Sequence, residues 1–167
     1  LAPPQAATWV YDIVIPGYTC NLTDIAASIG LVQLDRYSKL LERREDIIDQ
    51  YNKGFEGTRI KPLSHSSDDY KSCGHLYITH VEGATFEQRG EIIVKMAERG
   101  ISCNVHYKPL PLLTAYKNLG FDIENYPNAY NYYVKEITLP LHTRLSDEDV
   151  AVIIENFKEI AEEVVGE

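Results

Sequence analysis

One long helical segment constrains the fold of this chain more than any other feature. Asn21 or Thr23 can cap a helix, and apolar side chains then recur at helical spacing as far as Gly54. About 30 helical residues span ~45 Å, whereas a compact globule of 167 residues is only about 40 Å across. The helix therefore either bends, with Gly30 the expected place, or extends beyond its own domain. The recurring apolar residues are Ile25, Ile29, Val32, Tyr37, Leu41, Ile48, Tyr51 and Phe55.

The rest of the sequence alternates between strand-like and helix-like segments. Capping boxes at Thr85–Gln88 and Ser146–Asp149 each precede an apolar pattern with a helical period. This alternation predicts an α+β class, or α/β in the form of a small domain, with a small β-sheet covered by helices on one side. The expected strands are residues 74–81, 101–107 and 137–140, and the expected short helices are 112–119 and 128–134.

Residues 1–16 differ in character from the rest of the chain. The first seven, LAPPQAA, have the composition of a linker and include no initiator methionine. The segment from Trp9 to Ile15 has the β-branched and aromatic content of an extended arm. We expect residues 1–16 to be an extended lead, the remnant of a missing large domain. Residues 17–167 would then be a C-terminal small domain that begins with the long helix.

Charge and cysteine content exclude several classes of protein. The formal net charge is −9 and the sequence has no Lys/Arg stripe, so nucleic acid is not expected as a partner. Cys20, Cys73 and Cys103 lie far apart, which favours a reducing compartment over a disulfide framework. No apolar run approaches the ~20 residues that span a bilayer, and the N-terminus shows no signal-peptide pattern. We therefore expect a cytoplasmic protein without membrane contact.

The histidines, cysteines and lysines do not form a self-sufficient active site. None of the five histidines stands in a HExxH or CxxC setting, and no metal site is expected. His75 and His80 alternate across one expected strand, so they point to opposite faces and make poor joint ligands. No glycine-rich phosphate loop is present.

Two short stretches remain as candidates for binding. In the first, residues 17–25, a turn delivers polar side chains to a helix N-terminus, where backbone N–H groups and the helix dipole suit an anion. Asn21 and Thr23 could equally serve only as caps of that helix. In the second, residues 104–110, an expected strand ends in a polar cluster with His106 and Tyr107 before a proline-stiffened loop. Strand ends in α/β folds often border a ligand, although a histidine there can simply be exposed.

In order along the chain, these stretches resemble those of one known family. The match runs from about Trp9 to the end of the chain. It resembles the C-terminal part of the DegT/DnrJ/EryC/StrS-type sugar aminotransferases, of the fold-type I pyridoxal phosphate class. It is especially similar to the members that make UDP-4-amino-4-deoxy-arabinose for lipopolysaccharide. The stretches are Gly17-Tyr18-x-x-Asn21-Leu22-Thr23-Asp24-Ile25, Ala26 to Leu34, Glu42-Arg43-Arg44, His75-Leu76-Tyr77, Gly100-Ile101, Val105-His106-Tyr107 and Leu139-Pro140-Leu141.

The resemblance implies an activity that this chain cannot perform alone. The family's Schiff-base lysine stands before a Gly-Glu-Gly-Gly stretch in a large N-terminal domain, and no lysine here has that context. The chain would therefore hold no catalytic residue, and pyridoxal 5'-phosphate would bind only in the full-length homodimer. By the resemblance, Asn21 contacts the phosphate of the partner subunit's cofactor, whereas His106 and Tyr107 contact the nucleotide-sugar substrate. Glutamate would be the amino donor.

Some residues depart from the family pattern and leave other functions open. Pro111 stands where many relatives have a histidine, and Cys73-Gly74 precedes His75 where a tryptophan is often found. One alternative is a pyridoxal-phosphate-dependent sugar dehydratase of the same family. The other is a non-catalytic domain that only binds or dimerises.

Overall fold

The structure is a computed structural model that describes residues 21–166. The chain divides into two compact units, residues 1–36 and residues 37–167. The expected extended lead, residues 1–16, lies outside the described residues. The domain boundary expected at residue 17 stays a prediction.

The long helix α1 (Asp24–Gly54) runs through both units and confirms the helical pattern of the sequence. Thr23 caps it: its hydroxyl oxygen accepts a hydrogen bond from the backbone N–H of Ala26 at 3.2 Å. The helix continues through Gly30 without interruption. We predicted that α1 either bends or extends beyond its domain. That prediction involves both units together, so it stays a prediction.

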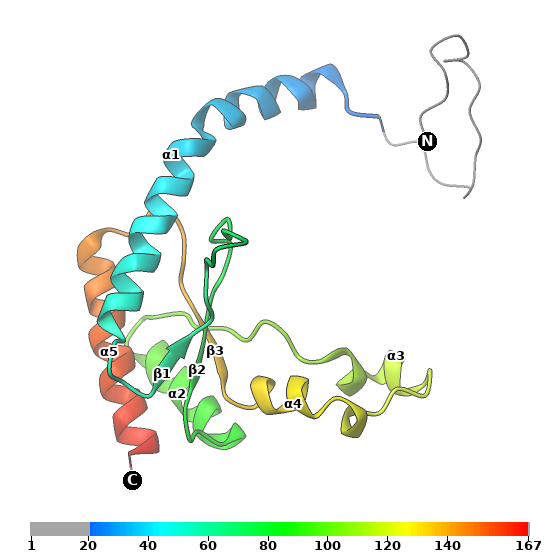
Figure 1. Ribbon diagram of the computed structural model, residues 1–167, viewed down its shortest axis with the longest axis vertical. Helices are drawn as coiled ribbons and strands as arrows, with labels where there is room; N and C mark the ends of the chain where they lie inside the picture. Colours follow the sequence, from blue (N-terminus) through cyan, green and yellow to red (C-terminus); the bar gives the residue numbers. More distant parts are fainter. Residues whose placement is uncertain (1–20, 167) are drawn as a thin grey trace. The chain divides into compact units, whose positions relative to one another are not determined.

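A small antiparallel sheet organises the second unit. It contains β1 (Ile60–Pro62), β2 (Tyr77–Val81) and β3 (Glu136–Leu139), in the order β1-β2-β3 (Figure 1). Strands β2 and β3 confirm two of the expected strands. The expected strand over residues 101–107 is wrong, because that segment makes only an isolated bridge from Asn104 to Thr138. β1 was not expected; it is an edge strand, where Pro62 costs no ladder hydrogen bond.

Two helices begin at the predicted capping boxes. At α2 (Phe86–Glu98), the Gln88 N–H donates to the Thr85 hydroxyl, and the Gln88 side chain accepts from the Thr85 N–H. The same reciprocal pair links Ser146 and Asp149 at the start of α5 (Asp147–Val165). Between α2 and β3 lie four short helical turns: η2 (Leu110–Leu112), α3 (Thr114–Lys117), η3 (Ile123–Asn125) and α4 (Pro127–Tyr133).

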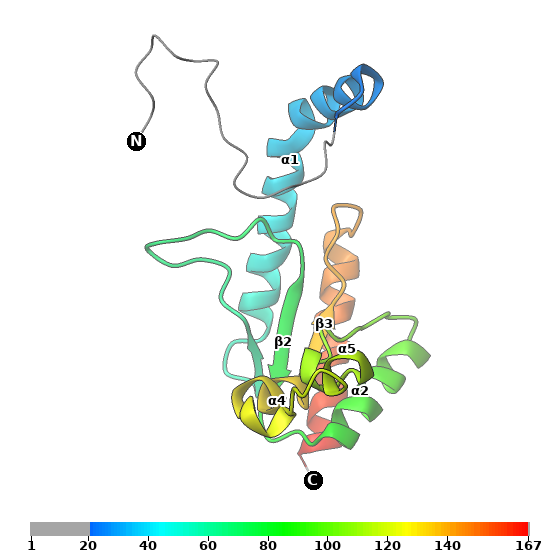
Figure 2. The same cartoon turned by 90° about the vertical axis from the view of Figure 1, so that its right-hand side faces the viewer.

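The core lies between one face of the sheet and helices α1, α2 and α5. Figure 2 shows α5 on the far side of β2 and β3. Aromatic rings join these elements: Tyr51 of α1 lies 4.7 Å from Tyr77 of β2, centroid to centroid, and Phe55 meets Phe157 of α5 edge-on at 5.7 Å. The helices therefore cover one side of the sheet, as predicted. The buried core residues include Ile47, Tyr51, Phe55, Tyr77, Val81, Ile92, Met96, Ile137, Leu139, Val150, Ile153, Phe157 and Ile160.

Phe157 offers a direct test of this core. Its side chain is fully buried, whereas Val152 on the same helix is 50% exposed. We expect Phe157→Ala to lower the free energy of unfolding by about 3–5 kcal/mol, through lost burial and the cavity left behind. Val152→Ala is the matched control and should change it by less than about 0.5 kcal/mol. Urea denaturation followed by circular dichroism measures both, and equal effects would contradict this packing.

Candidate functional site

The segment that carries His106 leaves the sheet immediately after one backbone bridge. The Asn104 N–H donates to the Thr138 carbonyl at 3.1 Å, and the Thr138 N–H donates back at 2.8 Å. The next two backbone donors then bind side chains instead of a strand: Val105 N–H donates to Asn104 Oδ1 at 2.8 Å, and His106 N–H donates to Glu136 Oε2 at 3.0 Å. This capture of backbone donors by side chains explains why no strand forms over residues 101–107.

His106 and Tyr107 lie together at the end of this segment. Their rings meet edge to face, with centroids 4.7 Å apart. Tyr107 is 72% exposed, whereas His106 is half-buried. Among the described residues, His106 Nδ1 is a buried atom without a hydrogen-bond partner. The substrate-contact role predicted for both residues stays a prediction.

The buried carboxylate of Glu136 accepts a hydrogen bond from His106 N–H. No sequence pattern predicted it. Glu136 is 1% exposed. Its Oε1 accepts a hydrogen bond from the Thr138 hydroxyl at 2.6 Å, and its Oε2 accepts the one from His106 N–H. Burial raises the pKa of Glu136, while these two hydrogen bonds and the charges of His106 and Arg89 oppose the rise. Glu136 is the first residue of its strand and follows Lys135, so the local sequence gives no signal of its burial.

Asn21, the predicted contact of the cofactor phosphate, belongs to the first unit. Its side chain is exposed and lies three residues before the start of α1. Thr23, not Asn21, accepts the capping hydrogen bond of the helix. Capping therefore gives no reason for an asparagine at this position. His106 and Tyr107 are in contact within the second unit, whereas Asn21 belongs to the first unit.

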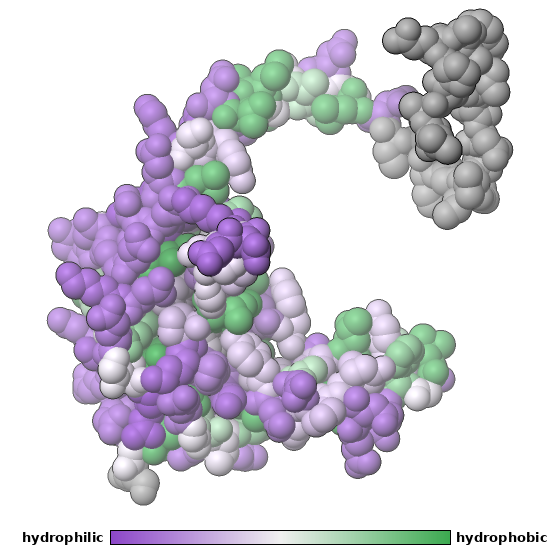
Figure 3. Space-filling view, viewed as in Figure 1, coloured by the Kyte–Doolittle hydropathy of each residue, from purple (hydrophilic) through white to green (hydrophobic). Residues whose placement is uncertain are grey.

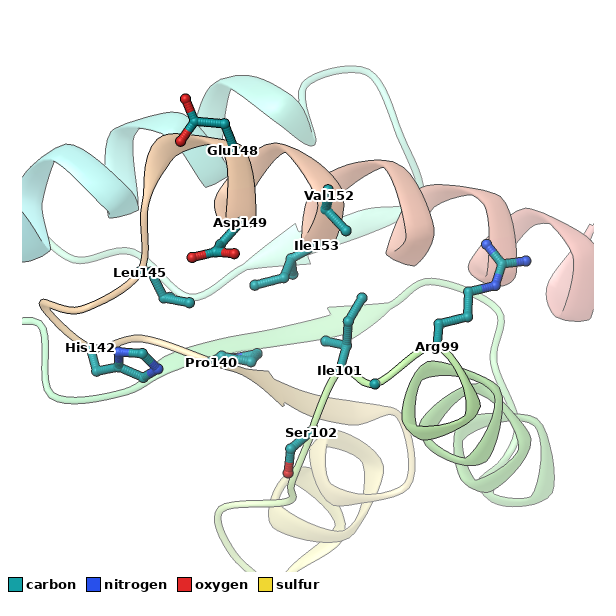
Figure 4. A pocket seen from close by; sticks show the side chains of 11 residues that line it. Arg99, Ile101, Ser102, Pro140, His142, Leu145, Glu148, Asp149, Val152 and Ile153 are labelled. Atoms are coloured by element: carbon teal, nitrogen blue, oxygen red, sulfur yellow. The ribbon is translucent and has the colours of Figure 1, made fainter.

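A groove lies near the start of α5, but the predicted site of His106 and Tyr107 is not part of it. It has a volume of about 680 Å³ and lies between α5 and the segment that follows α2 (Figure 4). Two of its charged groups already have partners: Asp149 caps α5, and Arg99 binds Glu159 with N–O distances of 2.8 and 3.0 Å. Neither His106 nor Tyr107 lines it. The groove therefore gives little support to a catalytic centre.

Two properties of the described residues bear on metals and membranes. Within residues 21–166, no group of three or more histidine, cysteine or acidic side chains is placed to hold a metal ion. No helix in that same range combines the length and apolar character needed to cross a bilayer.

Comparisons with known proteins extend this picture. The family model for the DegT/DnrJ/EryC1/StrS aminotransferases matches residues 3–158. The spore coat polysaccharide biosynthesis protein SpsC of Bacillus subtilis is 35% identical, in a match that covers 92% of this chain and 40% of SpsC. The UDP-4-amino-4,6-dideoxy-N-acetyl-beta-L-altrosamine transaminase of Campylobacter jejuni is 32% identical over 93% of this chain and 41% of its own length. The chain thus spans about 40% of the relatives it matches.

A solved structure shows the same fold. The Streptococcus pneumoniae protein Spr1654 in its apo form superposes with a TM-score of 0.86 at 63% identity. The match covers 95% of this chain and 40% of that protein. Spr1654 has also been solved in forms that contain PLP and PMP.

His80 gives a pH-dependent prediction for this region. It is half-buried, pairs with Glu136 across the sheet and meets Tyr132 edge-on at 5.5 Å. Burial lowers the pKa of His80, and Lys135 and Lys61 lower it further, whereas Glu82 opposes the shift. The unfolded chain therefore binds the proton more readily than the folded one. The stability that the neutral ring contributes is complete above pH 6.5, the ordinary pKa, and is lost as the pH falls towards the folded-state pKa.

The matched variants are His80→Gln and His75→Gln, since His75 is exposed. Urea denaturation at pH 7.5 and pH 5.5 should show a smaller loss of stability on acidification for His80→Gln than for the unchanged chain. His75→Gln should behave like the unchanged chain. An identical pH dependence in all three would refute the role of His80.

Proposed function

The chain belongs to the DegT/DnrJ/EryC1/StrS aminotransferase family, and from this membership we propose that it is the C-terminal domain of a sugar aminotransferase that uses pyridoxal 5'-phosphate. The full-length enzyme moves an amino group from glutamate to a keto carbon of a nucleotide-linked sugar. Its product serves lipopolysaccharide or another surface polysaccharide. The observation that carries the proposal is the family match over residues 3–158, at a length that is about 40% of the relatives.

The names of the relatives support both the reaction and its setting. The Campylobacter protein is a transaminase of a UDP-linked amino sugar, and the Bacillus protein serves a spore coat polysaccharide. The PLP and PMP forms of Spr1654 support the cofactor. Pyridoxal phosphate supplies the electron sink for amino transfer, and the protein supplies binding and orientation.

Asn21 is the residue of this chain that we assign to the cofactor. An exposed carboxamide can donate a hydrogen bond to a phosphate oxygen, and the positive end of the α1 dipole favours an anion nearby. Since Thr23 performs the capping of α1, Asn21 is free of that requirement. In the homodimer, Asn21 would hold the phosphate of the cofactor bound by the partner subunit.

His106 and Tyr107 are the residues that we assign to the nucleotide sugar. Sugar hydroxyls and phosphates need hydrogen-bond partners with fixed geometry, and a flat exposed ring adds an apolar contact surface. His106 is half-buried beside Tyr107, and Tyr107 is largely exposed. Both residues bind the substrate and do not transfer protons.

The first part of α1 supports the proposed partners. Ile25, Ile29 and Val32 lie on one face of the helix, while Leu31 and Leu34 lie on the opposite face. All five are between 58% and 76% exposed, and Figure 3 shows apolar residues gathered there. A helix that is apolar on opposite faces is normally buried. We assign these two faces to the N-terminal cofactor domain of the same protein and to the second subunit of a homodimer, and we place the enzyme in the cytoplasm.

Amino transfer by the full-length protein tests the proposal. With pyridoxal phosphate, glutamate and a UDP-linked 4-keto sugar, we expect an amino sugar and 2-oxoglutarate in equal amounts, measured by mass spectrometry. The 167-residue chain alone should be inactive, and borohydride should fix the cofactor to none of its lysines specifically. Loss of water from the sugar without amino transfer would indicate a dehydratase. Absence of any cofactor-dependent turnover would favour a binding domain.

Asn21→Ala in the full-length protein tests the cofactor contact. We expect cofactor binding to weaken by about 1–3 kcal/mol, the loss expected for a hydrogen bond to a charged group. Equilibrium dialysis against pyridoxal phosphate measures this change. Ser28→Ala is the control, because Ser28 is exposed and its hydroxyl only donates to the Ile25 carbonyl within α1. Equal affinity in the Asn21 variant and in the control would remove Asn21 from the cofactor site.

A further inference from the structure

We infer that Glu136 is a positioning residue, which holds the segment of His106 and Tyr107 in the conformation that receives the sugar substrate. This inference rests on the proposed function, since it assigns Glu136 to the sugar side of that reaction. Glu136 itself does not touch the substrate. It acts through the backbone of His106.

One hydrogen bond of the Glu136 carboxylate links β3 to the segment of His106, and a second one holds the carboxylate within β3. Glu136 belongs to β3, and its backbone is fixed there by pairing with β2. One carboxylate oxygen accepts the His106 N–H at 3.0 Å, and the other accepts the Thr138 hydroxyl at 2.6 Å. Both oxygens are thus held, and a hydrogen bond to an ionised acceptor is about twice as strong as a neutral one. The carboxylate ties a rigid strand to the residue that begins the site.

The fixed backbone of this segment ends at His106. From Asn104 to His106, each backbone N–H has a partner: the Thr138 carbonyl, then Asn104 Oδ1, then Glu136. The following residue, Tyr107, is 72% exposed. Glu136 therefore makes the last of three consecutive hydrogen bonds that fix the segment before the chain enters the site. Without it, the nearest hydrogen bonds from this segment to β3 would be those of Asn104, two residues before His106.

Burial of the Glu136 carboxylate is unfavourable for the fold by itself. A carboxylate removed from water destabilises a fold unless partners compensate, and apolar residues in such places are often at least as stable. The cations that face Glu136 give only partial compensation. Arg89 of α2 is 5% exposed and lies over the rings of Phe86 and Tyr133, at 4.6 and 5.1 Å. A role in fixing the conformation of the His106 segment accounts for a buried charge that stability alone does not favour.

The titratable groups around Glu136 come from several elements. His80 on β2 is its partner across the sheet. Arg89 on α2 and His106 act on its charge, and Glu136 in turn helps to raise the pKa of Tyr132 on α4. Any of these groups could disturb a measurement that relies on pH. The positioning role is therefore tested at one pH, with variants that alter only Glu136 and its hydrogen bonds.

Amide hydrogen exchange of the 167-residue chain tests the hydrogen bond without reference to activity. Glu136→Ala should speed exchange of the His106 amide by roughly tenfold or more, because its acceptor is lost. Glu136→Gln should restore slow exchange to within about threefold, since the side-chain carbonyl still accepts. Thr79→Val is the matched control: Thr79 is a buried sheet residue whose hydroxyl bonds the Ile137 carbonyl and has no link to His106. Unchanged exchange in Glu136→Ala would overturn the inference.

Kinetics of the full-length enzyme test the consequence for function. Glu136→Ala should raise KM for the nucleotide sugar by roughly tenfold, the effect of one hydrogen bond to a charged acceptor, with a smaller change in kcat. When glutamate alone is added, the absorbance of the bound cofactor should change at the same rate in Glu136→Ala as in the unchanged enzyme. The sugar takes no part in that step. Glu136→Gln should recover most of the affinity, and Thr79→Val should match the unchanged enzyme. A KM equal to that of the unchanged enzyme in Glu136→Ala, or equal damage in Glu136→Gln, would overturn the inference.

The outcomes separate this inference from the proposed function. An unchanged enzyme that transfers no amino group refutes the proposed function, while hydrogen exchange still decides whether Glu136 holds His106. An active enzyme whose glutamate and sugar steps both slow in Glu136→Ala refutes the positioning role alone. If Glu136→Ala does not fold, Thr138→Val replaces it. That variant removes the hydroxyl that orients the carboxylate, and it should raise both the exchange rate and KM by about threefold.

Discussion

The aromatic contact between α1, β2 and α5 is the interaction on which the described domain depends. A three-stranded sheet is too small to provide a core by itself, so its apolar face needs helices that pack closely against it. Tyr51 on α1 and Phe55, which directly follows α1, meet Tyr77 on β2 and Phe157 on α5, and thereby join the three elements at one place. The two tyrosine hydroxyls also have hydrogen-bond partners: Tyr51 donates to the Pro140 carbonyl and Tyr77 donates to Asn52 Oδ1. The C-terminal part of α1 therefore belongs to the hydrophobic core of the domain.

This core also determines which side of the sheet is available for binding. Tyr77, Ile137 and Leu139 face the helices, so the alternate residues of β2 and β3 face the other way. That second face carries His80, Glu136 and Thr138. It is polar, yet Glu136 and Thr138 are almost fully buried, and the segment of Asn104 to His106 binds both of them along the edge of β3. The proposed sugar site thus lies at the edge of a face that is already ordered by its own hydrogen bonds.

Local signals in the sequence predicted much of the fold, because local interactions produce those elements. Thr85 with Gln88 and Ser146 with Asp149 form their predicted capping boxes, which need no distant partner. The segment of residues 101–107 failed for the opposite reason. It has the β-branched and apolar content of a strand, but its N–H groups bind the side chains of Asn104 and Glu136. No local pattern reports a hydrogen bond to a residue 30 positions away. Glu136 was not predicted for that reason, whereas His106 was predicted as a substrate contact from the family pattern.

The two ends of α1 show how one element can serve both the fold and the assembly. From Ile47 to Tyr51 its apolar side chains are buried in the domain, while from Ile25 to Leu34 they are exposed on opposite faces. The helix needs no partner from the second segment to keep the core, since buried contacts already hold its last two turns. The apolar residues of the first segment are therefore not explained by this domain's own stability. They fit the proposed enzyme, in which α1 meets the cofactor domain and the second subunit, and in which Asn21, next to this segment, reaches the cofactor only after assembly.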